Sequence, residues 1–240
     1  MNDKMMYFRE SAFELGVELS EVQVEQFFNY YELLIEKNKV MNLTAITELD
    51  EVLKKHFLDS ISLAKVVDLK QNLSILDLGT GAGFPGIPLK IAFPQLEIYL
   101  VDSLNKRVLF LQEIIQKLNL DKIKAVHGRA EELARKKEYR EVFDLCVSRA
   151  VANLSTLSEY CIPFVKVGGS FISYKANEVE KEVEEAKKAL FLLGGKCTGV
   201  EQFLLPGTDI KRSFVMIEKE KKTPKTYPRK AGTPGKHPLV

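Results

Sequence analysis

The sequence predicts an α/β fold, with a seven-stranded, mostly parallel sheet, an antiparallel C-terminal hairpin and an N-terminal helical cap. Three observations predict it. An apolar run, Leu73–Leu78, leads into a glycine-rich stretch and then into helix-like sequence. Strand-like and helix-like segments then alternate, which is typical of parallel strands joined by right-handed crossovers. The last two strand-like segments are separated only by a turn, so they must pair antiparallel.

The first 70 residues have the apolar spacing of helices. One helix is predicted for Glu21–Lys39, where apolar side chains recur every three or four residues and Ser20 can cap the first turn. A second is predicted for Asp50–Val67, and the stretch MNLTAIT between them is predicted to be an extended connector. We expect residues 1–70 to form a helical cap on the main domain.

The main domain is predicted for residues 71–220. Its strands are expected at Leu73–Leu78, Leu96–Asp102, Ile123–Gly128, Val142–Ser148, Gly169–Lys175, Lys196–Leu205 and Ser213–Lys219. The helices between them are expected from the glycine-rich stretch to about Phe93, and at Asn105–Asn119, Glu131–Lys137, Leu154–Phe164 and Glu178–Leu192.

Positive charge is concentrated at the C-terminus. The chain has a formal net charge of +2, whereas residues 221–240 contain six Lys or Arg residues and no acid, which leaves −4 for the rest. This tail is rich in Pro, Gly and Lys, so we predict that it is irregular and contacts a polyanion.

Composition excludes several classes of protein. No apolar run approaches the roughly 20 residues that span a bilayer, and the N-terminal sequence lacks the apolar core of a secretion signal. The three cysteines and three histidines are scattered, so neither a disulfide framework nor a metal site is indicated. We expect a monomeric cytoplasmic protein without metal and without membrane contact.

The glycine-rich stretch, Leu73–Lys90, is the first candidate site. Glycines allow a tight turn or a close approach of backbone to a ligand, and an acid, Asp77, lies inside the preceding strand. Gly79, Gly81 and Gly83 are therefore candidate cofactor contacts. Because Gly81, Gly83 and Gly86 also satisfy the dinucleotide fingerprint, the loop alone leaves the kind of cofactor open.

The ends of the next strands supply polar candidates, because ligands bind at the carboxyl ends of parallel strands. Asp102 ends the second strand and can accept hydrogen bonds from ribose hydroxyls, with Ser103 beside it; the alternative is a surface acid or helix cap. Ala130 and Glu131 follow the third strand and could meet an adenine amino group, or Glu131 could be an ordinary first-turn acid.

Cations follow the fourth and fifth strands. Arg149 is expected to contact the cofactor or a phosphate, with a surface salt bridge as the alternative, and Lys175 is a weaker candidate of the same kind. We assign both a positioning role in catalysis. His56 and Asp59 could reach the pocket rim, although such residues on an amphipathic helix are more often cap or packing groups.

Several motifs of the chain together resemble a known family. LDLGTGAGFPGIPLK, Asp102, GRAEEL and SRAVANL together resemble S-adenosylmethionine-dependent methyltransferases of Rossmann-like fold. With NLTAI, KHFLDS and the ending YPRKAGTPGKHPL, the resemblance is to the RsmG family, also called glucose-inhibited division protein B, over nearly the whole chain. Carried over residue by residue, it implies cofactor contacts at Gly79, Phe84, Ala130, Glu131 and Arg149, with Asp102 as the ribose acid.

The resemblance also implies a reaction and a partner. It implies methylation of guanine N7 in a decoding-region loop of 16S rRNA in the small ribosomal subunit, and an association of enzyme loss with low-level streptomycin resistance. Guanine N7 has a free lone pair, so in-line transfer needs no general base. Adenine amino-group methylation commonly uses an Asn/Asp-Pro-Pro-aromatic tetrad where this chain has SRAV, and cytosine carbon methylation needs a cysteine in a Pro-Cys loop, whereas Cys146 lies inside a strand.

Two other functions stay open at this stage. One is an NAD-dependent oxidoreductase that uses the Gly81-Gly83-Gly86 fingerprint, although no catalytic Tyr-Lys pair is evident. The other is a noncatalytic RNA-binding protein with a methyltransferase fold.

Overall fold

A seven-stranded sheet forms the middle layer of the molecule, with strand order β3-β2-β1-β4-β5-β7-β6. The computed structural model describes residues 3–149, 152–176 and 179–239. The strands are β1 (Ser74–Leu78), β2 (Glu97–Asp102), β3 (Ile123–His127), β4 (Phe143–Ser148), β5 (Val165–Lys175), β6 (Gly195–Leu204) and β7 (Lys211–Lys219). β1 to β5 pair in parallel, and β7 runs antiparallel between β5 and β6. The predicted fold class is confirmed.

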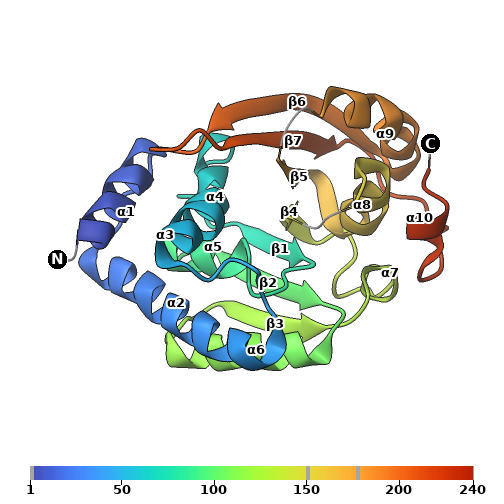
Figure 1. Cartoon of the computed structure of the whole chain (residues 1–240). Helices are drawn as coiled ribbons and strands as arrows, with labels where there is room; N and C mark the ends of the chain where they lie inside the picture. The colour runs from blue at the N-terminus through green and yellow to red at the C-terminus, as the bar shows by residue number, and fades with distance from the viewer. Residues whose placement is uncertain (1–2, 150–151, 177–178, 240) are drawn as a thin grey trace.

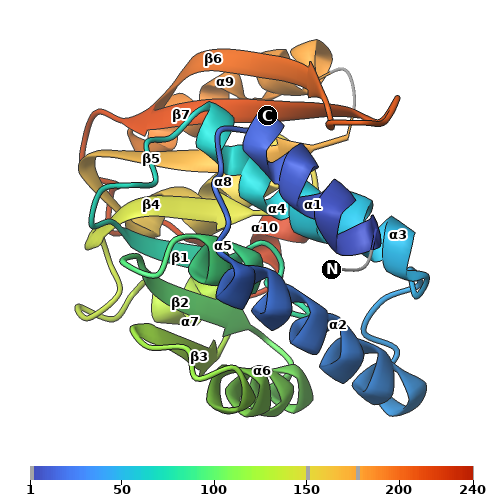
Figure 2. The same cartoon turned by 90° about the vertical axis from the view of Figure 1, so that its left-hand side faces the viewer.

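Helices cover both faces of the sheet (Figures 1 and 2). One face carries the N-terminal helices, α5 and α6, and the other carries α7 to α10. These helices are α1 (Asp3–Glu14), α2 (Glu21–Met41), α5 (Gly86–Ala92), α6 (Asn105–Lys117), α7 (Ala130–Leu133), α8 (Leu154–Cys161), α9 (Glu180–Leu193) and α10 (Thr233–Lys236). Neighbouring strand residues face opposite cores, because Ile75 and Val147 belong to one buried cluster and Leu76 and Cys146 to the other.

The N-terminal helices pack on the main sheet as expected. Helix α2 begins with a capping box, in which the Ser20 hydroxyl accepts from the Gln23 amide and the Gln23 side chain accepts from the Ser20 amide. The side chain of Gln23 also donates to the carbonyls of Ile91 and Ala92, so this cap joins α2 to the end of α5. The division into residues 1–70, 71–220 and 221–240 stays a prediction.

The segment predicted as one helix over Asp50–Val67 is helical from Leu49 to Lys65, but it is not a regular α-helix. The segment consists of α3 (Leu49–Val52), a π-helical turn η1 (Leu53–Leu58), α4 (Asp59–Ile61) and the 3₁₀ turn η2 (Ser62–Lys65). Two carbonyls of the π turn, those of Lys55 and His56, accept hydrogen bonds from Arg149.

The boundaries of several further elements differ from the prediction; the helix expected for Glu131–Lys137, for example, is α7, which ends at Leu133. β5 begins at Val165, and the helix expected for Leu154–Phe164 ends as a 3₁₀ turn, η3 (Ile162–Phe164). The helix expected from Glu178 is α9, which starts at Glu180; Glu178 itself lies outside the described residues.

The tail has no regular helix or strand over residues 223–232, as predicted, and a short helix, α10, follows. We call residues 223–239 the C-terminal strap. The strap contains α10 and returns across the molecule to lie beside α7 and α8 (Figure 1). Pro234 is buried in it, and Tyr227 and Leu239 pack against the core cluster on that side of the sheet.

Candidate cofactor site

The glycine-rich loop between β1 and α5 is held by one buried carboxylate. Oδ2 of Asp77 accepts from the Thr80 hydroxyl at 2.6 Å and from the Gly86 amide at 2.8 Å. A side chain at Gly86 would collide with this contact, because an added Cβ would lie 2.2 Å from Cδ2 of Leu100 and 2.9 Å from Oδ2 of Asp77. The early acid in the strand is therefore the anchor of the loop.

The environment of Asp77 changes its acidity. Burial raises the pKa of Asp77 to about 7, and the hydrogen bonds from Thr80 and Gly86 and the charge of Arg149 oppose this shift. The net direction shows that desolvation outweighs the hydrogen bonds at this position.

A second carboxylate, Asp102, joins the loop to the end of β2. Its Oδ2 accepts from the Gly81 amide at 3.0 Å, and its Oδ1 accepts from the Leu104 amide at 2.9 Å. The side chain of Arg107 lies 3.4 Å from Oδ2. Since Gly79 and Gly81 both have positive φ, 73° and 62°, the loop can curl around this acid without steric penalty.

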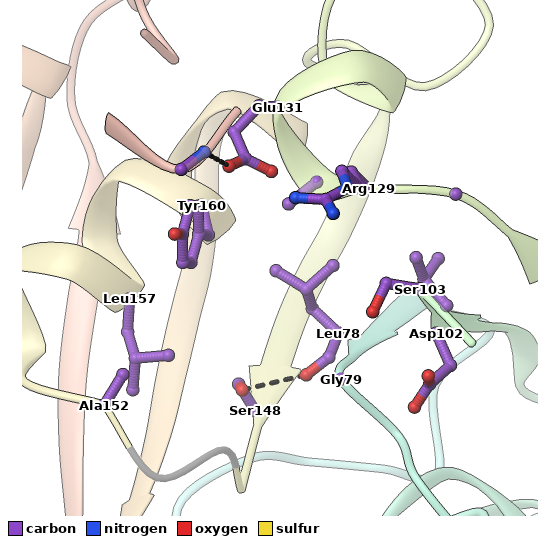
Figure 3. A pocket seen from close by; sticks show the side chains of 14 residues that line it. Leu78, Gly79, Asp102, Ser103, Arg129, Glu131, Ser148, Ala152, Leu157 and Tyr160 are labelled. Carbon is purple, nitrogen blue, oxygen red and sulfur yellow. Dashed lines mark hydrogen bonds between the residues drawn. The ribbon is translucent and has the colours of Figure 1, made fainter. Parts of the chain in front are cut away.

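A cavity of about 280 Å³ opens at the carboxyl ends of β1, β2 and β4 (Figure 3). This is where the strand order reverses, as expected for a ligand site in an open α/β sheet. The lining residues come from four strand ends, from α7 and α8, and from the C-terminal strap. They are Leu78, Gly79, Val101, Asp102, Ser103, Gly128, Arg129, Ala130, Glu131, Ser148, Ala152, Leu157, Tyr160 and Gly232.

The cavity has an apolar middle between two acids. Leu78, Val101 and Leu157 supply apolar surface, while Asp102 and Glu131 lie at different ends of the opening (Figure 3). Such a cavity fits a nucleoside, because a base can lie against apolar side chains and its ribose hydroxyls can donate to a carboxylate. The residues present therefore fit an adenosyl cofactor.

Glu131 is buried, with 6% of its surface exposed. Its Oε1 accepts from the amide of Gly232 at 2.9 Å, a contact across 101 positions of the chain. Gly232 is a lining residue that sequence reasoning missed, as were Leu157 and Tyr160 on α8. No local pattern signals these contacts, because each depends on how distant segments pack.

Comparison with known proteins assigns the chain to a family. A family model described as rRNA small subunit methyltransferase G matches residues 23–213. A protein of Lachnoclostridium phytofermentans, named ribosomal RNA small subunit methyltransferase G, is 57% identical over 226 residues, which are 94% of this chain and 93% of that protein. The chain belongs to the rRNA small subunit methyltransferase G family.

Further similarities agree with this membership. An Acetivibrio thermocellus protein with the same name is 51% identical over 244 residues and covers all of both chains. Among solved structures, the Methanococcus jannaschii fibrillarin pre-rRNA processing protein matches with a TM-score of 0.51 and 20% identity, over 65% of this chain and 71% of that one. M. jannaschii TYW2 in complex with AdoMet matches with a TM-score of 0.50 and 18% identity, over 62% and 70%. These structures support the fold alone.

Membership of the methyltransferase G family confirms the predicted enzyme class and its cofactor, S-adenosylmethionine. The glycine fingerprint therefore belongs to a methyltransferase and not to an NAD-dependent oxidoreductase. Within the described parts of the chain, no helix is both long and apolar enough to cross a membrane, and no group of three or more His, Cys, Asp or Glu residues is placed to hold a metal ion.

The predicted contacts of the methyltransferase G family divide into two groups in this structure. Gly79, Asp102, Ser103, Ala130 and Glu131 line the cavity. Gly81, Gly83, Phe84 and Arg149 are not among the lining residues.

Gly83 and Phe84 pack toward the N-terminal helices. An added Cβ at Gly83 would lie 2.5 Å from Cδ1 of Ile87 and 2.7 Å from the hydroxyl of Tyr30, so the position requires glycine. The ring of Phe84 stacks on His56, with ring centroids 4.4 Å apart. Burial and the charge of Arg149 lower the pKa of His56 to about 3, so His56 is neutral at physiological pH.

Arg149 points into the N-terminal helices rather than into the cavity. Besides the carbonyls of Lys55 and His56, it donates to the Ser60 hydroxyl at 3.0 Å and pairs with Asp59 at 3.1 Å. The guanidinium also lies 5.6 Å from the centre of the Phe84 ring. His56 and Asp59 are thus packing and pairing groups for Arg149.

Lys175 lies at the end of β5, outside the cavity lining. Its Nζ donates to the carbonyl of Ala152 at 2.9 Å and to Oε1 of Glu182 at 2.7 Å. Ala152 itself lines the cavity, so Lys175 touches the cofactor site through this one carbonyl.

Proposed function

We propose that this chain transfers a methyl group from S-adenosylmethionine to N7 of a guanine in the decoding-region loop of small-subunit 16S rRNA. The observation that carries the proposal is the nucleoside-sized cavity between Asp102 and Glu131, in a chain that belongs to the methyltransferase G family over most of its length. The names of its relatives state small-subunit ribosomal RNA as the substrate; guanine N7 and the decoding-region loop are what the family resemblance implies. We place the enzyme in the cytoplasm, as a monomer.

The cavity residues would hold the cofactor, which supplies an electrophilic methyl group when bound. Asp102 is the expected acceptor for ribose hydroxyls, and Glu131 with the backbone near Ala130 lies where an adenine edge would be read. Gly81, Gly83 and Phe84 are proposed to act by shaping the loop, since their contacts run to Asp102, Tyr30 and His56.

The polar side chains at the cavity already make hydrogen bonds within the protein, which supports attack by a nucleophile that needs no general base. Asp102 and Glu131 both accept backbone amides, and the Ser148 hydroxyl donates to the Leu78 carbonyl at 2.9 Å. Cys146 is fully buried, and burial raises its pKa well above the usual value. A neutral, inaccessible thiol is a poor nucleophile for carbon methylation of cytosine. Guanine N7 requires neither a base nor a thiolate.

We propose that RNA binds beside the cavity and that the basic tail contacts phosphates. Arg149 and Lys175 would position the reacting groups indirectly, through the helix residues and the Ala152 carbonyl that they hold. Five lysines of the tail are exposed, namely Lys221, Lys222, Lys225, Lys230 and Lys236. Arg229 is excluded from this set because it pairs with the buried Glu159.

Charge neutralisation tests the tail without removing it. Replacing Lys225, Lys230 and Lys236 by Gln should weaken binding of 16S rRNA and reduce the slope of log K against log salt by up to about 0.9 per lost phosphate contact. A matched control replaces Lys181, Lys187 and Lys196, three exposed lysines of α9 and β6. Equal salt slopes for the two triple variants would refute the tail contact.

The activity is tested with radiolabelled S-adenosylmethionine and small subunits from a strain that lacks the enzyme. We expect label in 16S rRNA, and cleavage by borohydride and aniline at a single guanine, which reports 7-methylguanosine. Free 16S rRNA in a parallel reaction identifies the preferred substrate. RNA binding without label would favour the noncatalytic alternative.

A further inference from the structure

The C-terminal strap forms one wall of the cofactor cavity. Gly232 lines the cavity beside Glu131 and Tyr160, and its amide donates to Oε1 of Glu131 at 2.9 Å (Figure 3). Gly232 has a φ of 81°, a conformation that favours glycine. The strap therefore orients a carboxylate that sequence analysis assigns to cofactor binding.

An ion pair between Arg229 and a buried carboxylate, Glu159, docks the strap on α8. The Arg229 side chain binds both oxygens of the Glu159 carboxylate, with Nη2 2.6 Å from Oε2 and Nε 3.0 Å from Oε1, and the Arg229 amide donates to Oε1 at 2.7 Å. Glu159 has no exposed surface. Undocking the strap would leave this carboxylate buried without its cation, which is strongly unfavourable.

A second set of contacts ties the strap to the segment that follows β3. Arg135 donates to the Pro228 carbonyl at 2.5 Å, and Arg140 donates to the carbonyls of Thr223 and Tyr227 at 2.8 and 3.0 Å. The same segment carries Ala130 and Glu131, two cavity residues. The position of the strap and the shape of the cavity are therefore mechanically linked.

We propose that the C-terminal strap contributes to cofactor binding. Docked through Arg229 and Glu159, it holds the Glu131 carboxylate through Gly232 and closes the cavity beside Tyr160, so that cofactor affinity depends on the strap. The inference rests on the proposed function, since the ligand is the adenosyl part of S-adenosylmethionine. By linkage, bound cofactor must stabilise the docked strap as much as the docked strap stabilises bound cofactor.

The test is a pair of shortened chains. One ends at Lys230, which keeps the Arg229–Glu159 pair and removes Gly232 and α10. The matched control ends at His237, which keeps Gly232, α10 and the carbonyl of His237 that accepts from Arg229. Calorimetric binding of S-adenosylhomocysteine should be at least about tenfold weaker for the chain that ends at Lys230, the loss of one hydrogen-bond contact to a charged group, and unchanged for the control.

The binding measurements separate failure of the strap proposal from failure of the proposed function. If the chain ending at Lys230 unfolds at the temperature of the intact chain and binds S-adenosylhomocysteine equally well, the strap proposal is wrong while the proposed function stands. If the intact chain does not bind S-adenosylhomocysteine, the proposed function fails and the strap proposal fails with it.

Hydrogen exchange on the intact chain decides the question if the shorter chain does not fold. Amides of residues 229–237 should exchange more slowly with S-adenosylhomocysteine than without it. Equal exchange rates at saturating ligand would overturn the proposal.

Discussion

The amide of Gly86 donates to Oδ2 of Asp77 at 2.8 Å, which ties the first residue of α5 to the strand that precedes the cofactor loop. The Thr80 hydroxyl shares the same oxygen at 2.6 Å. The other oxygen, Oδ1, is buried and has no hydrogen-bond partner among the described residues. One desolvated carboxylate therefore fixes both ends of the loop.

Asp77→Asn should change how stability depends on pH. The pKa of Asp77 is raised by burial to about 7, so between about pH 4 and 7 the folded state binds a proton that the unfolded state has lost. Stability from this group is therefore lost as pH rises through that window. At about 1.4 kcal/mol per pKa unit, wild type should lose on the order of 4 kcal/mol relative to the variant between pH 4 and 8.

Urea unfolding of both chains at several pH values measures this difference, and groups common to both chains cancel. Parallel pH profiles for the two proteins would show that Asp77 has an ordinary pKa.

Gly86→Ala should destabilise the fold through steric overlap. The added Cβ would lie 2.2 Å from Leu100 and 2.9 Å from Asp77, and overpacking of this kind costs about 1–3 kcal/mol. Gly199→Ala is the control, because its Cβ would meet only the flexible end of Met216. Thermal unfolding should separate the two variants; equal midpoints would mean that α5 can shift to make room.

The strands and the cavity acids could be predicted because both follow from local pattern. The bounds of β1 were predicted within one residue. Both faces of this strand are buried, with Ile75 in one core and Leu76 in the other, so the strand is a continuous apolar run in the sequence. Asp102 and Glu131 were found because the carboxyl ends of parallel strands meet at one edge of the sheet.

The direction of Arg149 and the course of the C-terminal strap could not be predicted. Arg149 follows a strand end, which indicates the cavity, yet its guanidinium binds the carbonyls of Lys55 and His56, which lie in a π turn more than 90 positions earlier. In the sequence, Arg229 cannot be distinguished from the other cations of the tail, and its partner Glu159 cannot be distinguished from a surface acid of a helix. Each partner acquires its role only when the chain is folded.

Asp102→Ala should weaken cofactor binding. Its carboxylate lies at the cavity and also holds the amides of Gly81 and Leu104, so the variant loses the ribose acceptor and loosens the loop. We expect a loss of about 1–3 kcal/mol, measured by calorimetry with S-adenosylhomocysteine. Glu97→Ala, an exposed position at the opposite end of β2, serves as the control. An unchanged Kd for Asp102→Ala would exclude the ribose role.

Asp59 joins three distant parts of the chain. Its Oδ1 lies 2.6 Å from Nε of Arg212 on β7, and its Oδ2 lies 3.1 Å from Nη2 of Arg149 at the end of β4. The Asp59 side chain is 4% exposed, whereas the two arginines are 18–20% exposed. One buried negative charge therefore separates two cations that retain partial contact with water.

Asp59→Asn should destabilise the protein because it leaves two guanidinium groups facing each other without a carboxylate. Loss of one partner from a buried ion pair costs about 3–5 kcal/mol, and the partial hydration of both arginines places the expected value at the lower end. Asp50→Asn is the matched control, since Asp50 forms an exposed pair with Lys4, and such pairs contribute at most about 1 kcal/mol. Urea unfolding at pH 7 compares them. Similar midpoints for both variants would mean that water, rather than Asp59, keeps Arg149 and Arg212 apart.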